Sequence, residues 1–173
     1  YRIAMLGKEA LLAKCLLSAT SLGGWEGGIS GSGQGLACHS MHGSHIALMA
    51  AARPAEGGFK VERLTAVVDV GRVINPEVTR QQIEGGLIFG LAAACGATSS
   101  YKDGRASARK LHQLGLPNLA QSPEILVELI ESDRDSGGFG EIAVPVVAPA
   151  IANALFTASG RRIRHLPLKE TAK

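Results

Sequence analysis

The pattern of hydrophobic and polar positions is clearest between residues 59 and 70. Apolar and charged side chains alternate from Phe59 to Leu64, and the chain is then apolar at every position from Ala66 to Val68. Alternation with a period of two is typical of a strand with one buried face, and a run that is apolar on both faces indicates a strand entering a core. The sequence therefore predicts a buried strand over residues 59–70.

Two more segments have the character of strands. Residues 36–52 are small, apolar and compatible with one strand, and residues 125–130 alternate again around Glu128. Between them, the Asp103-Gly104 pair predicts a tight hairpin turn.

Apolar residues at helical spacing predict three helices, over residues 2–18, 77–94 and 148–159. Asn75-Pro76 precedes the second, because Asn can cap a helix and Pro sets the φ of its first turn. Gly160 follows the third as its expected C-cap. Together the segments predict an α+β fold with an antiparallel or mixed sheet and packed helices.

Glycines gather in two places before residue 100. Those between Gly23 and Gly35 predict a loop, and their spacing does not match the dinucleotide-binding pattern G-x-G-x-x-G. Gly85, Gly86 and Gly90 fall inside a predicted helix, where each costs roughly 1 kcal/mol relative to Ala. Two explanations remain open for them: close contact between the helix and the sheet, or a bulky cofactor or neighbouring backbone against the glycine face.

Composition narrows the class of protein. The chain has 173 residues, 46% hydrophobic and 19% charged, which is typical of a globular protein with a real core. Aromatics at 4% and a formal net charge of +3 argue against a nucleic-acid-binding module. No apolar run has transmembrane length without charge. The chain begins with Tyr1, so we expect a fragment or a single domain of a longer protein.

The cysteines and histidines offer one alternative function. Cys15, Cys38 and Cys95 are widely spaced and form no Cys-x-x-Cys pair, so they predict neither a disulfide framework nor an iron–sulfur site. A His/Cys metal-binding module built from Cys38 with His39, His42 and His45 stays open, although partly buried or surface histidines are the simpler interpretation.

The main candidate for chemistry lies between Ser136 and Pro145. Gly137, Gly138 and Gly140 allow close backbone approach, and Glu141 then stands at the start of a long apolar segment. Burial among apolar neighbours favours the neutral form of a carboxylate, which is how a protein obtains a general base active near neutral pH. We expect Glu141 to have such neighbours. The alternative is a solvated carboxylate after a flexible turn.

Several segments, in this order, resemble the large subunit of molybdenum hydroxylases. Residues 68–76 (VDVGRVINP) with residues 82–91 (QIEGGLIFGL) are similar to a cofactor-binding portion of that family. Residues 138–141 (GFGE) with residues 148–154 (APAIANA) resemble its closing glycine–glutamate motif and helix. Residues 161–168 resemble the tail of the branch that contains isoquinoline 1-oxidoreductase and membrane-associated aldehyde dehydrogenases.

The resemblance implies a molybdenum–pyranopterin cofactor, with the cytosine dinucleotide form as one option, and iron–sulfur clusters only on a partner subunit. Such enzymes hydroxylate an aldehyde or N-heteroaromatic substrate with water-derived oxygen, and a glutamate takes up a proton. By motif position Glu141 is that base. The implied cofactor-binding residues are Gln82, Gly85, Gly86, Gly138, Phe139 and Gly140, and this chain supplies no metal ligand.

The expected organisation is a C-terminal molybdopterin-binding domain fragment. Residues 1–32 form a helical and glycine-rich lead-in, residues 33–168 the family-like core and residues 169–173 a tail. Expected partners are the remaining lobes of the large subunit, a small iron–sulfur subunit and a small-molecule substrate, with no nucleic acid. One departure is Ile142, where the family has proline after the glutamate. A non-catalytic scaffold, with Glu141 structural, stays open as an alternative.

Overall fold

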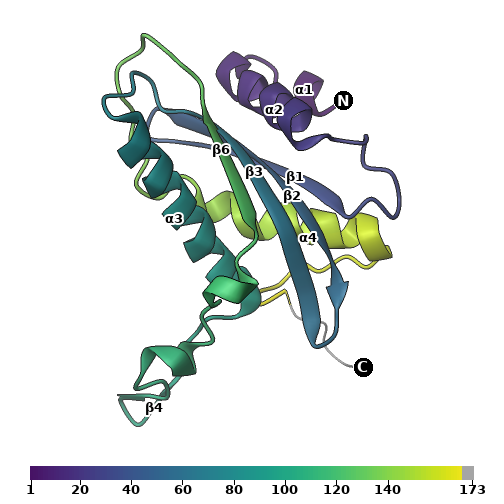
Figure 1. Cartoon of the computed structure of the whole chain (residues 1–173), viewed down its shortest axis with the longest axis vertical. Coiled ribbons are helices and arrows are strands. Elements are labelled where there is room, and N and C mark those ends of the chain that lie inside the picture. Colours follow the sequence, from purple (N-terminus) through teal and green to yellow (C-terminus); the bar gives the residue numbers. More distant parts are fainter. Residues whose placement is uncertain (169–173) are drawn as a thin grey trace.

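The computed structural model describes residues 1–168, and the expected tail at 169–173 lies outside them. Its centre is a four-stranded sheet in the order β1 (Gln34–Met41), β2 (Ser44–Ala55), β3 (Gly58–Asp69) and β6 (Glu124–Leu129) (Figure 1). The strand β2 pairs antiparallel with both β1 and β3, and β6 pairs parallel with β3. The expected α+β fold with a mixed sheet is confirmed.

Helices cover both faces of this sheet (Figure 1). The helix α2 (Ala10–Gly23) lies on one face, while α3 (Pro76–Cys95) and α4 (Val144–Ser159) lie on the other. The predicted cap is confirmed, because the Val78 backbone N–H donates to Asn75 Oδ1 over 3.1 Å. Gly160 adopts the left-handed conformation expected of a C-cap.

Two predicted helix boundaries were wrong. The expected helix 2–18 is divided into α1 (Arg2–Met5) and α2, because Gly7 between them has a φ of +59°. The last helix begins at Val144, four residues before its predicted start at Ala148. Pro145 sits in its first turn, where the missing N–H of proline costs nothing.

The prediction of one strand over residues 36–52 was also wrong. The chain reverses at His42 and Gly43, with φ values of +51° and +77°, and so forms the β1–β2 hairpin. Ser40 therefore pairs with His45 and Met41 with Ser44. Glycine suits this φ, and histidine is among the few other residues that tolerate it.

The core has two layers because side chains alternate along β2 and β3. One set of side chains packs against α3 and α4, and it includes Ile46, Leu48, Leu64, Ala66 and Val68. The other set packs against α2, and it includes Ala47, Met49 and Val67. The expectation that β3 becomes apolar on both faces as it enters a core is confirmed.

The helix α4 lies directly on the backbone of the edge strand β1. Asn153 Nδ2 donates to the Leu36 carbonyl at 2.9 Å, and Thr157 Oγ1 donates to the Gln34 carbonyl at 2.8 Å. A Cβ added at Gly35 would stand 2.2 Å from both the Ala150 carbonyl oxygen and the Ala154 nitrogen. Only glycine permits this approach, which places the middle and C-terminal half of α4 against the edge strand.

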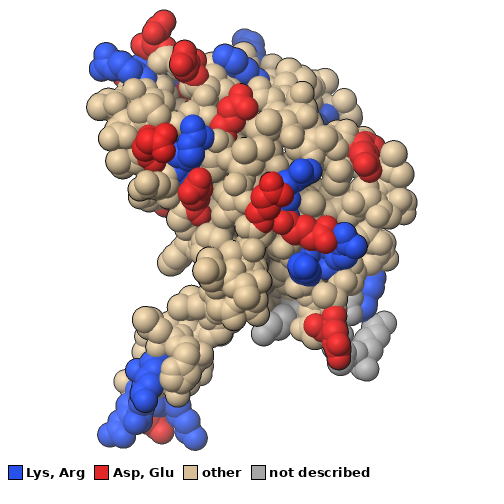
Figure 2. All heavy atoms as spheres, in the orientation of Figure 1, with Lys and Arg blue, Asp and Glu red and all other residues tan. Residues whose placement is uncertain are grey.

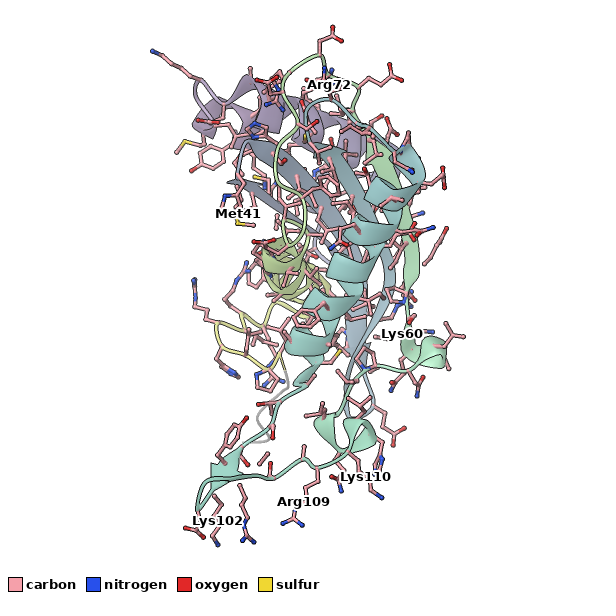
Figure 3. All side chains as sticks on the ribbon, turned by 90° about the vertical axis from the view of Figure 1, so that its left-hand side faces the viewer. Met41, Lys60, Arg72, Lys102, Arg109 and Lys110 are labelled. Carbon is pink, nitrogen blue, oxygen red and sulfur yellow. The ribbon has the colours of Figure 1, made fainter. Side chains whose placement is uncertain are left out.

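The segment after α3 forms an arm that projects from the body (Figure 1). It contains the short strands β4 (Tyr101–Lys102) and β5 (Arg105–Ala106), confirming the turn at Asp103-Gly104, followed by the 3₁₀ turns Leu111–Leu114 and Leu119–Gln121. Basic side chains gather at its tip in Figure 2, and Figure 3 shows Lys102 and Arg109 there. Within residues 1–168, no helix is long and apolar enough to cross a membrane.

Cys15 lies on the side of α2 that faces the sheet, and its thiol is fully buried. This burial, together with the nearby Asp69 carboxylate, raises the pKa of the thiol to about 12. An unfolded chain releases this proton near pH 9, whereas the folded chain keeps it, so unfolding becomes more favourable as the pH rises from 9 towards 12.

We expect the Cys15 contribution to lower the free energy of unfolding by about 1.4 kcal/mol per pH unit in that window. Urea unfolding of the wild type and of Cys15→Ala, at pH values from about 8 to about 11, measures this pH dependence. The wild type should lose stability more steeply with pH than the variant. Parallel slopes would contradict the burial of a protonated thiol.

Candidate functional site

The glycine-rich segment 136–141 lies where three elements meet. The Gly137 backbone N–H donates to the Val70 carbonyl at 2.8 Å, just after β3, and the Gly138 N–H donates to the His42 carbonyl at 2.9 Å, in the β1–β2 turn. A Cβ at Gly137 would stand 2.4 Å from Ser44 Oγ, and a Cβ at Gly138 would stand 2.9 Å from the His42 Cβ. Both glycines are therefore required for close approach to the turn.

Glu141 follows this segment and points to solvent. Its side chain is 66% exposed, so the expectation of a carboxylate held among apolar neighbours was wrong for the described chain. The buried positions on either side are taken by Phe139, which packs on the main core, and by Ile142, which is fully buried. These two anchors hold the backbone of Glu141 while leaving its carboxylate at the surface.

Gln82 reaches the same segment from α3. Its Nε2 donates to the Gly140 carbonyl over 2.6 Å, which joins residues 58 positions apart in the chain. Both residues are exposed. The structure thus brings together Gln82 and Gly140, which the sequence singled out separately. Gly140 immediately precedes Glu141, the candidate base.

The helix glycines have different surroundings. A Cβ at Gly86 would stand 3.0 Å from the Ala143 Cβ, and one at Gly90 would stand 2.7 Å from the Val144 carbonyl oxygen. Both face α4, so the close contact lies between two helices and not, as one explanation had it, between helix and sheet. Gly85 is exposed and has no neighbour within 4 Å of its added Cβ. Packing therefore explains Gly86 and Gly90 but leaves Gly85 unexplained.

The two kinds of helix glycine should respond oppositely to alanine. Gly85→Ala should stabilise the chain by about 0.5–1 kcal/mol, because alanine is the better helix former and meets no atom. Gly90→Ala should destabilise it by about 1–3 kcal/mol, because its Cβ overlaps α4. Urea unfolding of both variants measures the difference. If both changes proved neutral, the α3–α4 contact would not be as tight as described.

The histidines and Cys38 do not form a metal cluster. The His45 ring is hydrogen-bonded with Ser40, at 2.8 Å between Nδ1 and Oγ, and the His42 Nε2 lies 3.9 Å from Glu141 Oε1. Among residues 1–168, no three side chains of His, Cys, Asp and Glu come together in a way that could hold a metal ion. The structure therefore gives the His/Cys metal-binding alternative no site.

Three backbone N–H groups beside the carboxylate have no acceptor within the described residues. In the part of the chain that the structure describes, the N–H groups of Phe139, Gly140 and Glu141 donate to no protein acceptor. They precede the N-terminus of the 16-residue helix α4. Free backbone donors at such a position suit oxygen or nitrogen acceptors of a bound group. A Cβ at Gly140 would also meet no atom within 4 Å, so this side of the loop is open.

A pair of residues that sequence reasoning missed lies behind the loop. Asp69 is buried at the end of β3, and its Oδ1 accepts a hydrogen bond from Arg134 Nη2 at 2.7 Å. The only local signal was a charge at the end of an apolar strand, and nothing near Arg134 marked it as the partner.

Comparison with known proteins gives a consistent result. A model of the molybdopterin cofactor-binding domain matches residues 12–123, which include Gln82, Gly85 and Gly86 and stop short of Glu141. The chain is 27% identical over 175 residues to the isoquinoline 1-oxidoreductase subunit beta of Brevundimonas diminuta, covering 98% of this chain and 22% of the relative. It is 34% identical over 113 residues to a membrane-bound aldehyde dehydrogenase of Gluconacetobacter polyoxogenes, covering 65% of this chain and 15% of that one.

A solved structure agrees with these relatives. The aldehyde oxidoreductase from Desulfovibrio desulfuricans superposes with a TM-score of 0.59 and 28% identity, over 72% of this chain and 14% of the other. The chain spans only 15–22% of the length of the two curated relatives.

Proposed function

Because this chain belongs to the molybdopterin cofactor-binding domain family, we propose that it forms one wall of the molybdenum site of an oxidoreductase. The proposed reaction is hydroxylation of an aldehyde or an N-heteroaromatic compound with water-derived oxygen. The observation that carries the proposal is the hydrogen bond from Gln82 to the Gly140 carbonyl, because it unites the cofactor-binding helix with the segment that ends in Glu141.

The residues present fit a large cofactor that approaches from one side. The N–H groups of residues 139–141, which have no acceptor among the described residues, are available to donate to it, and both Gly85 and Gly140 leave room for it against the backbone. The loop does not line the cavity of about 420 Å³ that lies between β3, the end of α3 and residues 115–122. The wall is therefore open, and the remaining contacts are proposed to come from other lobes of the large subunit.

When bound, the molybdenum–pyranopterin group supplies the two-electron oxidation chemistry. Gln82 donates to the Gly140 carbonyl and so ties the loop to α3, next to N–H groups that have no acceptor among the described residues. Phe139 and Ile142 pack on the core on either side of Glu141 and so fix the backbone from which its carboxylate extends. We propose Glu141 as the general base, and Gln82, Gly85, Gly86, Gly138, Phe139 and Gly140 as the cofactor-binding residues.

Burial of Glu141 is then completed by the other lobes and the cofactor, not by this chain. The carboxylate is 66% exposed here, so the desolvation that strengthens a carboxylate as a general base has to come from those other parts. The proposed partners are an iron–sulfur subunit that receives the electrons and a cofactor of the pterin or cytosine dinucleotide form. The relative named as a subunit beta supports the presence of a partner subunit, and the relatives named for isoquinoline and aldehyde support these substrate classes.

Metal and pterin analysis of the purified protein that contains this chain tests the proposal. We expect about one molybdenum per chain, a fluorescent pterin after oxidation, and dye-coupled oxidation of an aldehyde or N-heterocycle. Release of cytidine monophosphate by acid would identify the dinucleotide form. Full expression in a molybdenum-replete host with no bound molybdenum would contradict the proposal and favour the non-catalytic scaffold.

A further inference from the structure

A partly buried ion pair lies next to the candidate catalytic loop. The Asp69 side chain is 1% exposed, and that of Arg134 is 35% exposed. Asp69 Oδ1 accepts from Arg134 Nη2 at 2.7 Å and from the Gly71 backbone N–H at 2.9 Å. One carboxylate oxygen, Oδ1, thus accepts from both a guanidinium and a backbone N–H, and these bonds fix the direction of the chain as it leaves β3.

Arg134 extends this contact to a second element. Its Nη1 donates to the Gly43 carbonyl at 3.0 Å, in the β1–β2 turn. Its own carbonyl accepts from the Arg72 N–H at 2.9 Å. One side chain and one peptide group of Arg134 therefore link the end of β3, the β1–β2 turn and the loop.

These links continue into the glycine segment. Ser136 Oγ donates to the Arg72 carbonyl at 2.5 Å, and the Gly137 and Gly138 N–H groups donate to Val70 and His42. Every residue from 134 to 138 except Asp135 donates or accepts a described hydrogen bond in this arrangement. Asp135 is held by contact, because a Cβ at Gly71 would stand 2.1 Å from its carbonyl oxygen.

The same turn carries His42, whose Nε2 lies 3.9 Å from Glu141 Oε1. The position of the turn relative to the loop therefore also sets the distance between this imidazole and the carboxylate.

We propose that Arg134 is a positioning residue for Glu141, acting through its bonds to Asp69 and to the Gly43 carbonyl. This inference rests on the proposed role of Glu141 as the base. A base works only when it lies within hydrogen-bond reach of the proton it removes, and small displacements cost much of the rate. Removing a charge pair from water is costly, and in this structure the pair holds the loop in one position.

The test compares four forms of the cofactor-loaded enzyme. Arg134→Met leaves the Asp69 carboxylate buried without its partner and can fail to fold. The double variant Asp69→Asn with Arg134→Met removes both charges and keeps the volume, so it should fold. Arg134→Lys keeps the charge but cannot reach two acceptors with a planar fork. The matched control is Arg53→Met with Glu62→Gln, a remote exposed pair with the same 2.7 Å separation.

We expect the double variant to lose at least about tenfold in kcat, with KM within about twofold and molybdenum content unchanged. Arg134→Lys should recover part of that loss, and the control pair should match the wild type. Independently of activity, the amide protons of Gly137 and Gly138 should exchange faster in the double variant, while those in the middle of β2 and β3 stay protected.

Wild-type kcat together with wild-type exchange at Gly137 and Gly138 in the folded double variant would overturn the proposal. So would an equal loss of kcat in the Arg53/Glu62 control. If instead Glu141→Gln retains full turnover while the exchange at Gly137 and Gly138 still rises in the double variant, the assignment of the base is wrong. Arg134 then orders the loop without positioning a base.

Discussion

Glu141→Gln in the cofactor-loaded enzyme should lower kcat by about 10²–10⁴-fold, because the amide cannot accept the proton that a carboxylate accepts. The side chain is exposed and makes no described contact shorter than 3.9 Å, so the change should leave folding and molybdenum content unaltered. Steady-state kinetics with a dye acceptor, normalised to molybdenum, measures the loss.

A matched control residue lies in the same segment between β6 and α4. Glu131 is also an exposed carboxylate, ten positions earlier in the chain, and Glu131→Gln should retain wild-type kcat. Turnover of Glu141→Gln within about twofold of the wild type, with the cofactor present, would leave the scaffold interpretation of this carboxylate standing.

Gly35→Ala should strongly destabilise the fold. Its Cβ would meet the Ala150 carbonyl oxygen and the Ala154 nitrogen, both at 2.2 Å, and both are backbone atoms inside a helix. Neither can move without displacing α4 from β1, which also breaks the bonds from Asn153 and Thr157 to that strand. We expect a loss of about 3 kcal/mol or more in the free energy of unfolding.

Urea unfolding of Gly35→Ala and Gly85→Ala isolates the effect of the steric overlap with α4. Both variants add one methyl group, but only the methyl group at Gly35 meets other atoms. The first should unfold at much lower urea and the second at slightly higher urea than the wild type. Equal midpoints would show that α4 does not lie on the β1 backbone.

The strands and helices with a clear period were predictable from the sequence. Residues 59–70 alternate and then become fully apolar, and the structure makes them the central strand β3. The start of the helix after Asn75 was marked by a capping residue and a proline. In these places local propensity, capping and burial agree, which is the condition for a reliable prediction.

The failures have physical causes that lie outside any local pattern. The turn at His42-Gly43 lacks the Asn-Gly or Asp-Gly signature of a tight hairpin, so two strands were taken for one. Glu141 was expected to be buried because its neighbours are apolar, but Phe139 and Ile142 occupy the buried side.

Long-range partners were beyond sequence reasoning as well. Asp69 and Arg134 are 65 positions apart, and Gln82 and Gly140 are 58 positions apart. No periodicity links such residues, because their contact depends on how α3, β3 and the loop before α4 pack in three dimensions. The family resemblance named Gln82 and Gly140 singly, and the structure adds that they touch.

The most direct test of the account is the position of Glu141 in an experimental structure of the intact, cofactor-loaded enzyme. We predict that its carboxylate lies within hydrogen-bond reach, about 3 Å, of an atom in the coordination shell of the molybdenum, with Gln82 and residues 138–140 along the pterin side. A carboxylate that still faces bulk solvent, with the metal on another face of the chain, would contradict the account.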